Sequence, residues 1–176
     1  MIMPSPRTGI EPKIHENAFV APTAVIIGDV VIGEGTNIWF GAVLRGDFGR
    51  IEVGKNTSIQ ENVAVHCTPA QSAKIGSNCI IGHGSIIHGP CEIGDNCLVG
   101  MGAKVIHNSK LGQDSLLAAG SVLTNKKIPP NSMVVGIPAE VKRKIKTGAG
   151  IQGAMGYVEN GRIFKEFFEK HPEYLK

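Results

Sequence analysis

The sequence predicts an all-β fold class, a parallel β-helix of hexapeptide repeats followed by a C-terminal α-helix. Three observations predict it: an aliphatic residue every six positions, a mostly small residue four places after each, and a change of pattern beyond residue 137. A period of six matches neither the α-helix nor simple strand alternation, but it fits a short strand followed by a tight bend. Three such sides close a triangular coil, and stacked coils pair their backbones at about 4.8 Å.

The aliphatic ladder defines the expected core. Its eighteen members are Ile14, Val20, Ile26, Ile32, Ile38, Leu44, Val53, Ile59, Val65, Ile75, Ile81, Ile87, Ile93, Val99, Val105, Leu111, Leu117 and Leu123. Cys79, Cys91 and Cys97 all occupy the small inward position, so we expect them to fill the core rather than to serve redox or metal chemistry. Cys67 lies outside this pattern and is left unexplained.

The tail of the chain follows a different pattern. In the segment RIFKEFFEKH, Ile163, Phe164, Phe167 and Phe168 are at helical spacing, which predicts a terminal helix that covers one face of the β-helix. We therefore expect a β-helix domain over residues 1–137 and a helical tail over residues 138–176 packed on it. A length of 176 residues makes two full domains unexpected.

Composition and charge argue against several classes of protein. The 18 basic and 15 acidic residues are scattered along the chain, which gives nucleic-acid binding no support. No apolar run approaches the ~18 residues of a membrane span, and the first residues lack the pattern of a signal peptide. Four cysteines without a CxxC pair are too few for a disulfide framework. We expect a cytoplasmic protein with no nucleic-acid or membrane partner.

Two interruptions of the repeat mark a candidate site. The spacing of the ladder lengthens by three residues after Leu44 and by four after Val65, and both insertions leave the same corner on adjacent rungs. Outward residues at equivalent positions on successive rungs stack about 4.8 Å apart, so Arg45, His66 and His88 should form one column beside these loops.

Stacked histidines suggest a metal site. Three His ligands with an open fourth position are the arrangement of a catalytic zinc. His83 is nearest in sequence to His88, but it lies on the preceding side of the coil and points away from the column. One chain is therefore not expected to supply all three ligands, whereas a neighbouring subunit in a closed ring could supply the third.

In these histidine-bearing segments the chain resembles a known family, the gamma-class carbonic anhydrases. The matching stretches are IWFGAVLRGD (38–47), TSIQENVAVH (57–66) and IGHGSIIHG (81–89). The resemblance implies a left-handed β-helix and a homotrimer with zinc, or alternatively iron or cobalt, at each subunit interface. It implies His66 and His88 as metal ligands from one subunit and His83 as the ligand from the next.

The same resemblance implies a reaction and catalytic residues. Arg45 and Asp47 match the Arg-Gly-Asp positions of the family at the interface and site, and Gln60 matches the glutamine that hydrogen-bonds near the metal-bound water. The implied reaction is the reversible hydration of carbon dioxide to bicarbonate by metal-bound hydroxide, because a divalent ion lowers the pKa of its bound water towards ~7.

Three departures limit the resemblance. Position 61 is Glu where the family commonly has Asp, and position 48 is Phe where the active members carry Glu. The loop HCTPAQSAK after His66 has no carboxylate, so no acidic loop residue is visible to export protons. The short loop without a carboxylate resembles that of the shorter-loop members of the family, in which hydration activity is variable. The segment around Tyr157 matches poorly, which leaves any role of Tyr157 undefined.

Other functions stay open on the same repeat. An acyl or acetyl transferase would use His as a base and would not need three metal-ligand positions. A thioesterase-like hydrolase would use the same metal, and a non-enzymatic trimeric scaffold would hold the metal only as a staple between subunits. Metal with an open water position, as opposed to four protein ligands, separates the catalyst from the staple.

Overall fold

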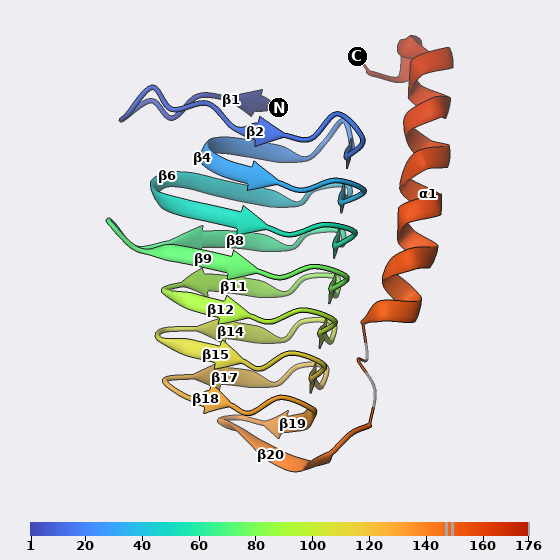
Figure 1. Ribbon diagram of the computed structural model, residues 1–176. Coiled ribbons are helices and arrows are strands. Elements are labelled where there is room, and N and C mark those ends of the chain that lie inside the picture. Colours follow the sequence, from blue (N-terminus) through green and yellow to red (C-terminus); the bar gives the residue numbers. More distant parts are fainter. Residues whose placement is uncertain (147, 149, 176) are drawn as a thin grey trace.

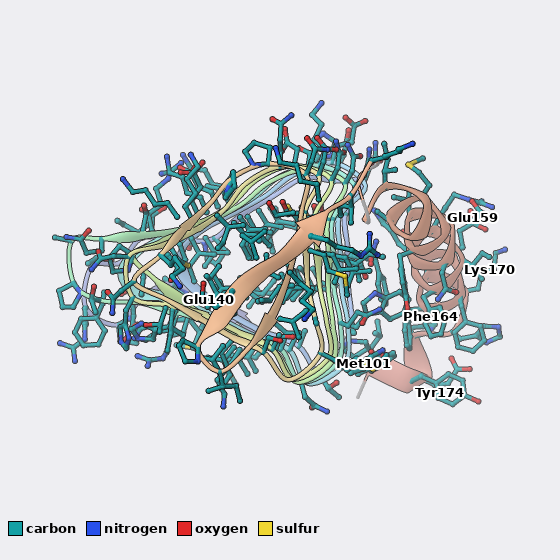
Figure 2. All side chains as sticks on the ribbon, turned by 90° about the horizontal axis from the view of Figure 1, so that it is seen from below. Met101, Glu140, Glu159, Phe164, Lys170 and Tyr174 are labelled. Atoms are coloured by element: carbon teal, nitrogen blue, oxygen red, sulfur yellow. The ribbon has the colours of Figure 1, made fainter. Side chains whose placement is uncertain are left out.

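The computed structural model describes residues 1–146, 148 and 150–175 and confirms the parallel β-helix with one C-terminal helix (Figure 1). Every strand pairing is parallel among the described residues except that of the last two strands, β19 and β20. Seen along its axis, the β-helix has a three-sided cross-section, and α1 lies against one of the sides (Figure 2). None of the helices in the described part of the chain has both the length and the apolar character needed to cross a bilayer.

Each side of the coil is one face of stacked strands. The first face contains β2 (Lys13–Ile14), the second half of β4 (Val25–Ile32), the second half of β6 (Val43–Val53), β9 (Ser72–Ile75), β12 (Cys91–Ile93), β15 (Ser109–Leu111) and β18 (Lys127–Ile128). The second face contains β3 (Phe19–Val20), β5 (Asn37–Ile38), β7 (Ser58–Ile59), β10 (Ile80–Ile81), β13 (Leu98–Val99), β16 (Leu116–Leu117), β19 (Ser132–Gly136) and β20 (Ala139–Lys144). The third face contains β1 (Ile2–Met3), the first halves of β4 and β6, β8 (Ala64–Cys67), β11 (Ile86–Gly89), β14 (Lys104–Ile106) and β17 (Val122–Thr124).

The aliphatic ladder forms the core, as predicted. All of its members except Ile14 and Val20 are buried, and they meet in register, for example Val65 opposite Ile87. Each buried aliphatic side chain stabilises the fold by about 1.5–3 kcal/mol relative to an exposed one. The hydrophobic effect along this continuous ladder therefore holds the rungs together.

The four cysteines are free and buried, which confirms the prediction for the three in the repeat. The Cys79 and Cys97 thiols donate to the carbonyls of Gly94 and Gly112 on the next rung, both at 3.2 Å. Thr57 makes the equivalent bond one rung earlier at 2.7 Å. This inward position therefore favours a small side chain with a donor, which Cys supplies as well as Thr does.

Cys67 is also part of the interior. It is fully buried at the corner between the third and first faces, with its thiol 3.7 Å from the carbonyl of Arg50. The two insertions build this corner: β6 continues through it, and Arg50 pairs with Ser72 on the far side of the second loop. The loop between β8 and β9 projects beyond the other turns of the β-helix (Figure 1).

The tail contains one strand that the sequence analysis did not anticipate. β20 turns back and pairs antiparallel with β19, so it closes the open end of the second face before the chain reaches α1 (Ile151–Lys170) and the short 3-10 helix η1 (Pro172–Leu175). The expected boundary at residue 137 falls in the turn between β19 and β20.

The helix packs on the second face through only part of its predicted apolar stripe. Phe164 lies 5.2 Å from Trp39 and 5.9 Å from Phe19, measured between ring centroids. The predicted coverage of one face by the terminal helix is confirmed, but Ile163 and Phe167 remain 51% and 43% exposed, so helical spacing alone does not determine which of the four apolar residues are covered. The helix turns the side containing Gly161 toward the sheet, where a Cβ atom would already meet that of Asn37 at 3.1 Å.

Candidate metal centre

The predicted column exists on the third face. In the strand register, Arg45 lies opposite His66, and His66 lies opposite His88 on the following rung. The two imidazole rings are 5.5 Å apart between centroids and nearly perpendicular. Two imidazole side chains therefore stand next to each other on a rigid sheet, beside the corner that the two insertions build.

One hydrogen bond orients His66. Its Nδ1 lies 2.7 Å from the backbone carbonyl of Arg45, and since a carbonyl can only accept, we assign the proton to Nδ1. The lone pair is then on Nε2, which is the arrangement found in metal-binding histidines whose other nitrogen donates to a carbonyl. The fold thus presents His66 Nε2 as a free donor atom.

His88 is held in the neutral form that binds metals. Burial, followed by the nearby imidazole of His66, lowers the pKa of His88. Its Nδ1 is buried and has no hydrogen-bond partner among the described residues. A buried nitrogen without a partner carries a desolvation cost, which a bound ion or a neighbouring chain would relieve. The donor set of the column therefore fits a divalent metal.

A carboxylate anchors the upper end of the column. Arg45 Nη1 donates to both oxygens of Asp47, at 3.0 and 2.9 Å, and the Asp47 side chain is only 13% exposed. The same carboxylate lies 3.8 Å from His66 Nδ1. The predicted pair of Arg45 and Asp47 is therefore next to the histidines on the same face.

The other two predicted site residues form a second group, at the corner between the second and third faces. His83 Nδ1 lies 2.7 Å from Glu61 Oε2, and the buried Gln60 accepts a hydrogen bond from the His83 backbone N–H at 3.2 Å. The Glu61 carboxylate thus lies beside His83 Nδ1, and the other ring nitrogen, Nε2, remains available. Sequence reasoning missed this contact, although positions 61 and 83 are adjacent along the corner.

The structure does not bring the two groups together within one chain. Among residues 1–146, 148 and 150–175, no cluster of three or more His, Cys, Asp or Glu side chains could hold a metal ion. Tyr157 lies beside Gln60, in a largely apolar hollow of about 480 Å³. One chain therefore carries two incomplete halves of the predicted site.

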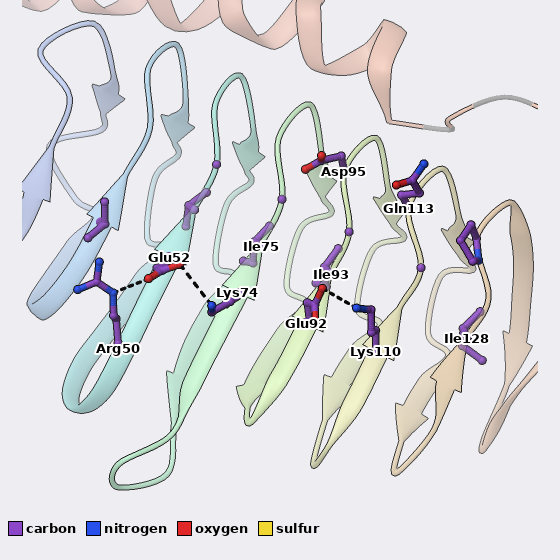
Figure 3. A pocket seen from close by; sticks show the side chains of 17 residues that line it. Arg50, Glu52, Lys74, Ile75, Glu92, Ile93, Asp95, Lys110, Gln113 and Ile128 are labelled. Carbon is purple, nitrogen blue, oxygen red and sulfur yellow. Dashed lines mark hydrogen bonds and ion pairs between the residues drawn. The ribbon is translucent and has the colours of Figure 1, made fainter.

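The first face has a different character. Glu52, Lys74, Glu92 and Lys110 alternate in sign on successive rungs and form ion pairs such as Lys110–Glu92 at 2.8 Å (Figure 3). A shallow hollow of about 710 Å³ lies over this ladder, but none of the predicted site residues lines it. The charged side chains of this ladder pair with one another, so we interpret the first face as a solvent-exposed surface that does not contribute to the predicted metal site.

The chain matches the family described as bacterial transferase hexapeptide (six repeats) over residues 11–46, 72–105 and 90–125. It is 42% identical over 162 residues to gamma carbonic anhydrase 2, mitochondrial, of Arabidopsis thaliana, which covers 86% of this chain and 58% of that relative. The chain thus spans little more than half the length of that relative. It is also 44% identical over 132 residues to a protein of Methanocaldococcus jannaschii named probable carbonic anhydrase, covering 75% of this chain and 83% of that one.

A solved structure is similar over nearly the whole chain. A hexapeptide transferase family protein from Anaplasma phagocytophilum superposes with a TM-score of 0.85 at 37% identity, covering 92% of this chain and 96% of that one. The similarity extends through the β-helix and most of the tail.

Proposed function

Because this chain belongs to the hexapeptide-repeat family and is a gamma-carbonic-anhydrase-like protein, we propose that it hydrates carbon dioxide reversibly to bicarbonate. The observation that carries the proposal is the pair of stacked imidazoles, His66 and His88, oriented with a free nitrogen beside Arg45 and Asp47. We further propose that zinc is the metal, that iron or cobalt would also suit imidazole ligands, and that the site lies between subunits of a homotrimer. The free, buried thiols are compatible with a reducing cytoplasm.

The ligands proposed for the metal are His66 and His88 of one chain and His83 of a neighbouring copy. The chemistry supplied there is Lewis acidity, which lowers the pKa of water towards ~7. The Glu61 carboxylate, 2.7 Å from His83 Nδ1, favours the ring orientation and tautomer that leave Nε2 available to a metal. An acceptor oxygen thus lies close to Nδ1 of both His66 and His83, whereas Nδ1 of His88 has no partner among the described residues.

Three other residues contribute on the substrate side. Gln60 uses its Oε1 to accept from the His83 backbone, so its amide NH2 group is free to donate to water or to a substrate oxygen. Asp47 fixes the Arg45 guanidinium, whose positive charge attracts the bicarbonate product. The roles of Gln60, Arg45 and Asp47 are therefore to orient and to bind.

The outer surface of the third face supports the trimer. A second outward column on this face consists of the residues two positions before Arg45, His66, His88 and their equivalents. It is mostly apolar: Val25, Val43, Ala64, Ile86, Lys104 and Val122. Ile86 is 39% exposed in the single chain. The equivalent column on the first face is charged, so association is expected through the third face, where three copies around an axis would bury apolar surface.

A chelation experiment tests the proposed function. Stopped-flow hydration of carbon dioxide should be measured on the purified protein, after removal of metal and after reloading with zinc, with metal content determined on each sample. Activity that disappears with the metal and returns in proportion to bound zinc supports the proposal. Full zinc occupancy without any hydration would contradict it and favour the non-enzymatic scaffold.

The main alternative is an acyl or acetyl transferase. The fold is shared with a solved hexapeptide transferase family protein, but a shared fold does not determine the chemistry of a site. Acetyl transfer from acetyl-coenzyme A that persists in metal-free protein would favour the transferase. A thioester hydrolysis that needs zinc would instead indicate a hydrolase at the same metal.

A further inference from the structure

The segment after β1 reaches the site from outside the repeat. β1 pairs with the start of β4, and the Ser5 hydroxyl then accepts hydrogen bonds from the backbone N–H groups of Arg7 and Thr8, at 3.2 and 3.3 Å. Ser5 is buried, so this turn is fixed to the body of the protein. The backbone of Arg7 is therefore held in place at the third face.

The Arg7 side chain has two partners at the site. Its guanidinium carbon lies 4.3 Å from the centre of the Phe48 ring, and its Nε lies 3.9 Å from Asp47 Oδ2. The Phe48 ring in turn lies 5.8 Å from that of His66. Phe48, which stands where an acidic residue is absent, thus provides an aromatic ring that the Arg7 guanidinium contacts next to the histidine column.

The charges around Asp47 do not balance. One carboxylate faces two guanidinium groups, that of Arg45 at 2.9 Å and that of Arg7 at 3.9 Å. Arg50, the next arginine along the corner, is already paired with Asp29 and Glu52. The Arg7 and Arg45 pair therefore retains one positive charge that Asp47 does not neutralise, and the guanidinium of Arg7 is largely exposed to an incoming ligand.

We propose that Arg7 and Arg45 together form an anion-binding subsite at the mouth of the metal centre. Its ligand class is a small planar monoanion with two equivalent oxygens, such as bicarbonate or a simple carboxylate. A guanidinium presents parallel N–H donors that match this geometry, and stacking on an aromatic ring holds its plane. The identification of bicarbonate as the natural ligand rests on the proposed hydration reaction, whereas the anion subsite itself does not.

Anion titration of four proteins tests this subsite. Zinc-loaded wild type, Arg7→Ala, Arg7→Lys and Arg143→Ala would each be titrated at constant ionic strength with carbon-13-labelled bicarbonate, and separately with acetate, with binding followed by NMR. Arg143 lies on β20 at the opposite end of the β-helix and serves as a control for the loss of one positive charge (Figure 1). Zinc content and the thermal unfolding midpoint are measured on every sample.

The expected result is a dissociation constant raised about three- to tenfold by Arg7→Ala, a smaller increase for Arg7→Lys, and no change for Arg143→Ala. Unchanged affinity for both anions in Arg7→Ala, at equal zinc content, would overturn the subsite. So would a wild type that binds neither anion. If the wild type fails to hydrate carbon dioxide but binds anions in an Arg7-dependent way, the subsite stands and the proposed reaction falls.

Discussion

Refolding two metal-deficient variants together tests whether every site is shared between chains. His66→Ala lacks one ligand on the third face, and His83→Ala lacks the ligand at the corner, so trimers of either variant alone should lose zinc. Within one chain these residues belong to separate groups, with His66 beside His88 and His83 beside Glu61. Each variant therefore keeps the half-site that the other has lost.

Random mixing sets the size of the recovery. In an equimolar mixture, an interface is complete when the chain that supplies the third-face pair is the His83→Ala variant and its neighbour is the His66→Ala variant. Each condition holds for half of the positions, so about a quarter of the interfaces in a closed ring of three are complete. Elemental analysis after refolding should find zinc at about that fraction of the wild-type content.

A matched mixture calibrates the experiment. His15 is an exposed histidine outside both groups, so refolding His15→Ala with His83→Ala should leave about half of the interfaces complete. Recovery near one half in this control, with no recovery in the His66→Ala and His83→Ala mixture, would refute the shared site. It would mean that the three histidines bind within one chain. Recovery of about one half in the mixture and full recovery in the control would instead mean that His83 is not a ligand.

Hydration should be slow in dilute buffer and rise with added imidazole, because position 48 is Phe and the following loop offers no carboxylate; stopped-flow rates that do not depend on buffer would contradict this. Glu61→Ala should weaken zinc binding about 10- to 100-fold in a chelator competition, whereas Glu61→Asp should retain most of the affinity because it keeps a carboxylate near His83. Burial raises the pKa of Cys91 to about 12 in the folded protein, whereas an exposed thiol in the unfolded chain has a pKa of ~8.5. The contribution of the neutral, buried thiol to stability is therefore present below pH ~8.5 and falls as the pH rises towards 12, because the unfolded chain ionises first. Between pH 8.5 and 10 urea unfolding should show the wild type losing about 1.5 kcal/mol more than Cys91→Ala, and equal losses would show that the thiol is not buried in solution. Asn78 has φ of 56°, and its side-chain amide is hydrogen-bonded to those of Asn56 and Asn96 on the neighbouring rungs. Asn78→Ala should lower the free energy of unfolding by about 1–2 kcal/mol, and Asn78→Gly by less, because glycine loses the amide hydrogen bonds but adopts a positive φ without strain. Equal losses in the two variants would refute the backbone contribution.

The core and the column were predictable because both follow from a strict period. Once Val65 and Ile87 are assigned to equivalent inward positions, the next residues, His66 and His88, must stack on the outside of adjacent rungs. The insertions were also visible, because they interrupt the same period. Regular repetition converts spacing along the chain directly into position in space.

Contacts outside the repeat were not predictable in the same way. Glu61 and His83 lie in turns, where the side-chain directions depend on the bend and not on the period, so their close contact was missed. The seat of Arg7 on Phe48 joins a non-repetitive N-terminal segment to an insertion, and no spacing rule relates the two. In α1, helical spacing identified Phe164 and Phe167 alike, but only packing against the second face decides which of them is covered.

The positions of the half-sites connect assembly with chemistry. His83 precedes β11 at one edge of the third face, and His88 lies near the end of the same strand at the other edge. Between the edges, the outward side chains are mostly apolar, including the exposed Ile86. In the proposed trimer, a head-to-tail ring contact through this surface would bring one edge of a chain against the opposite edge of the next. The surface that favours association is therefore the same surface that would complete the metal site.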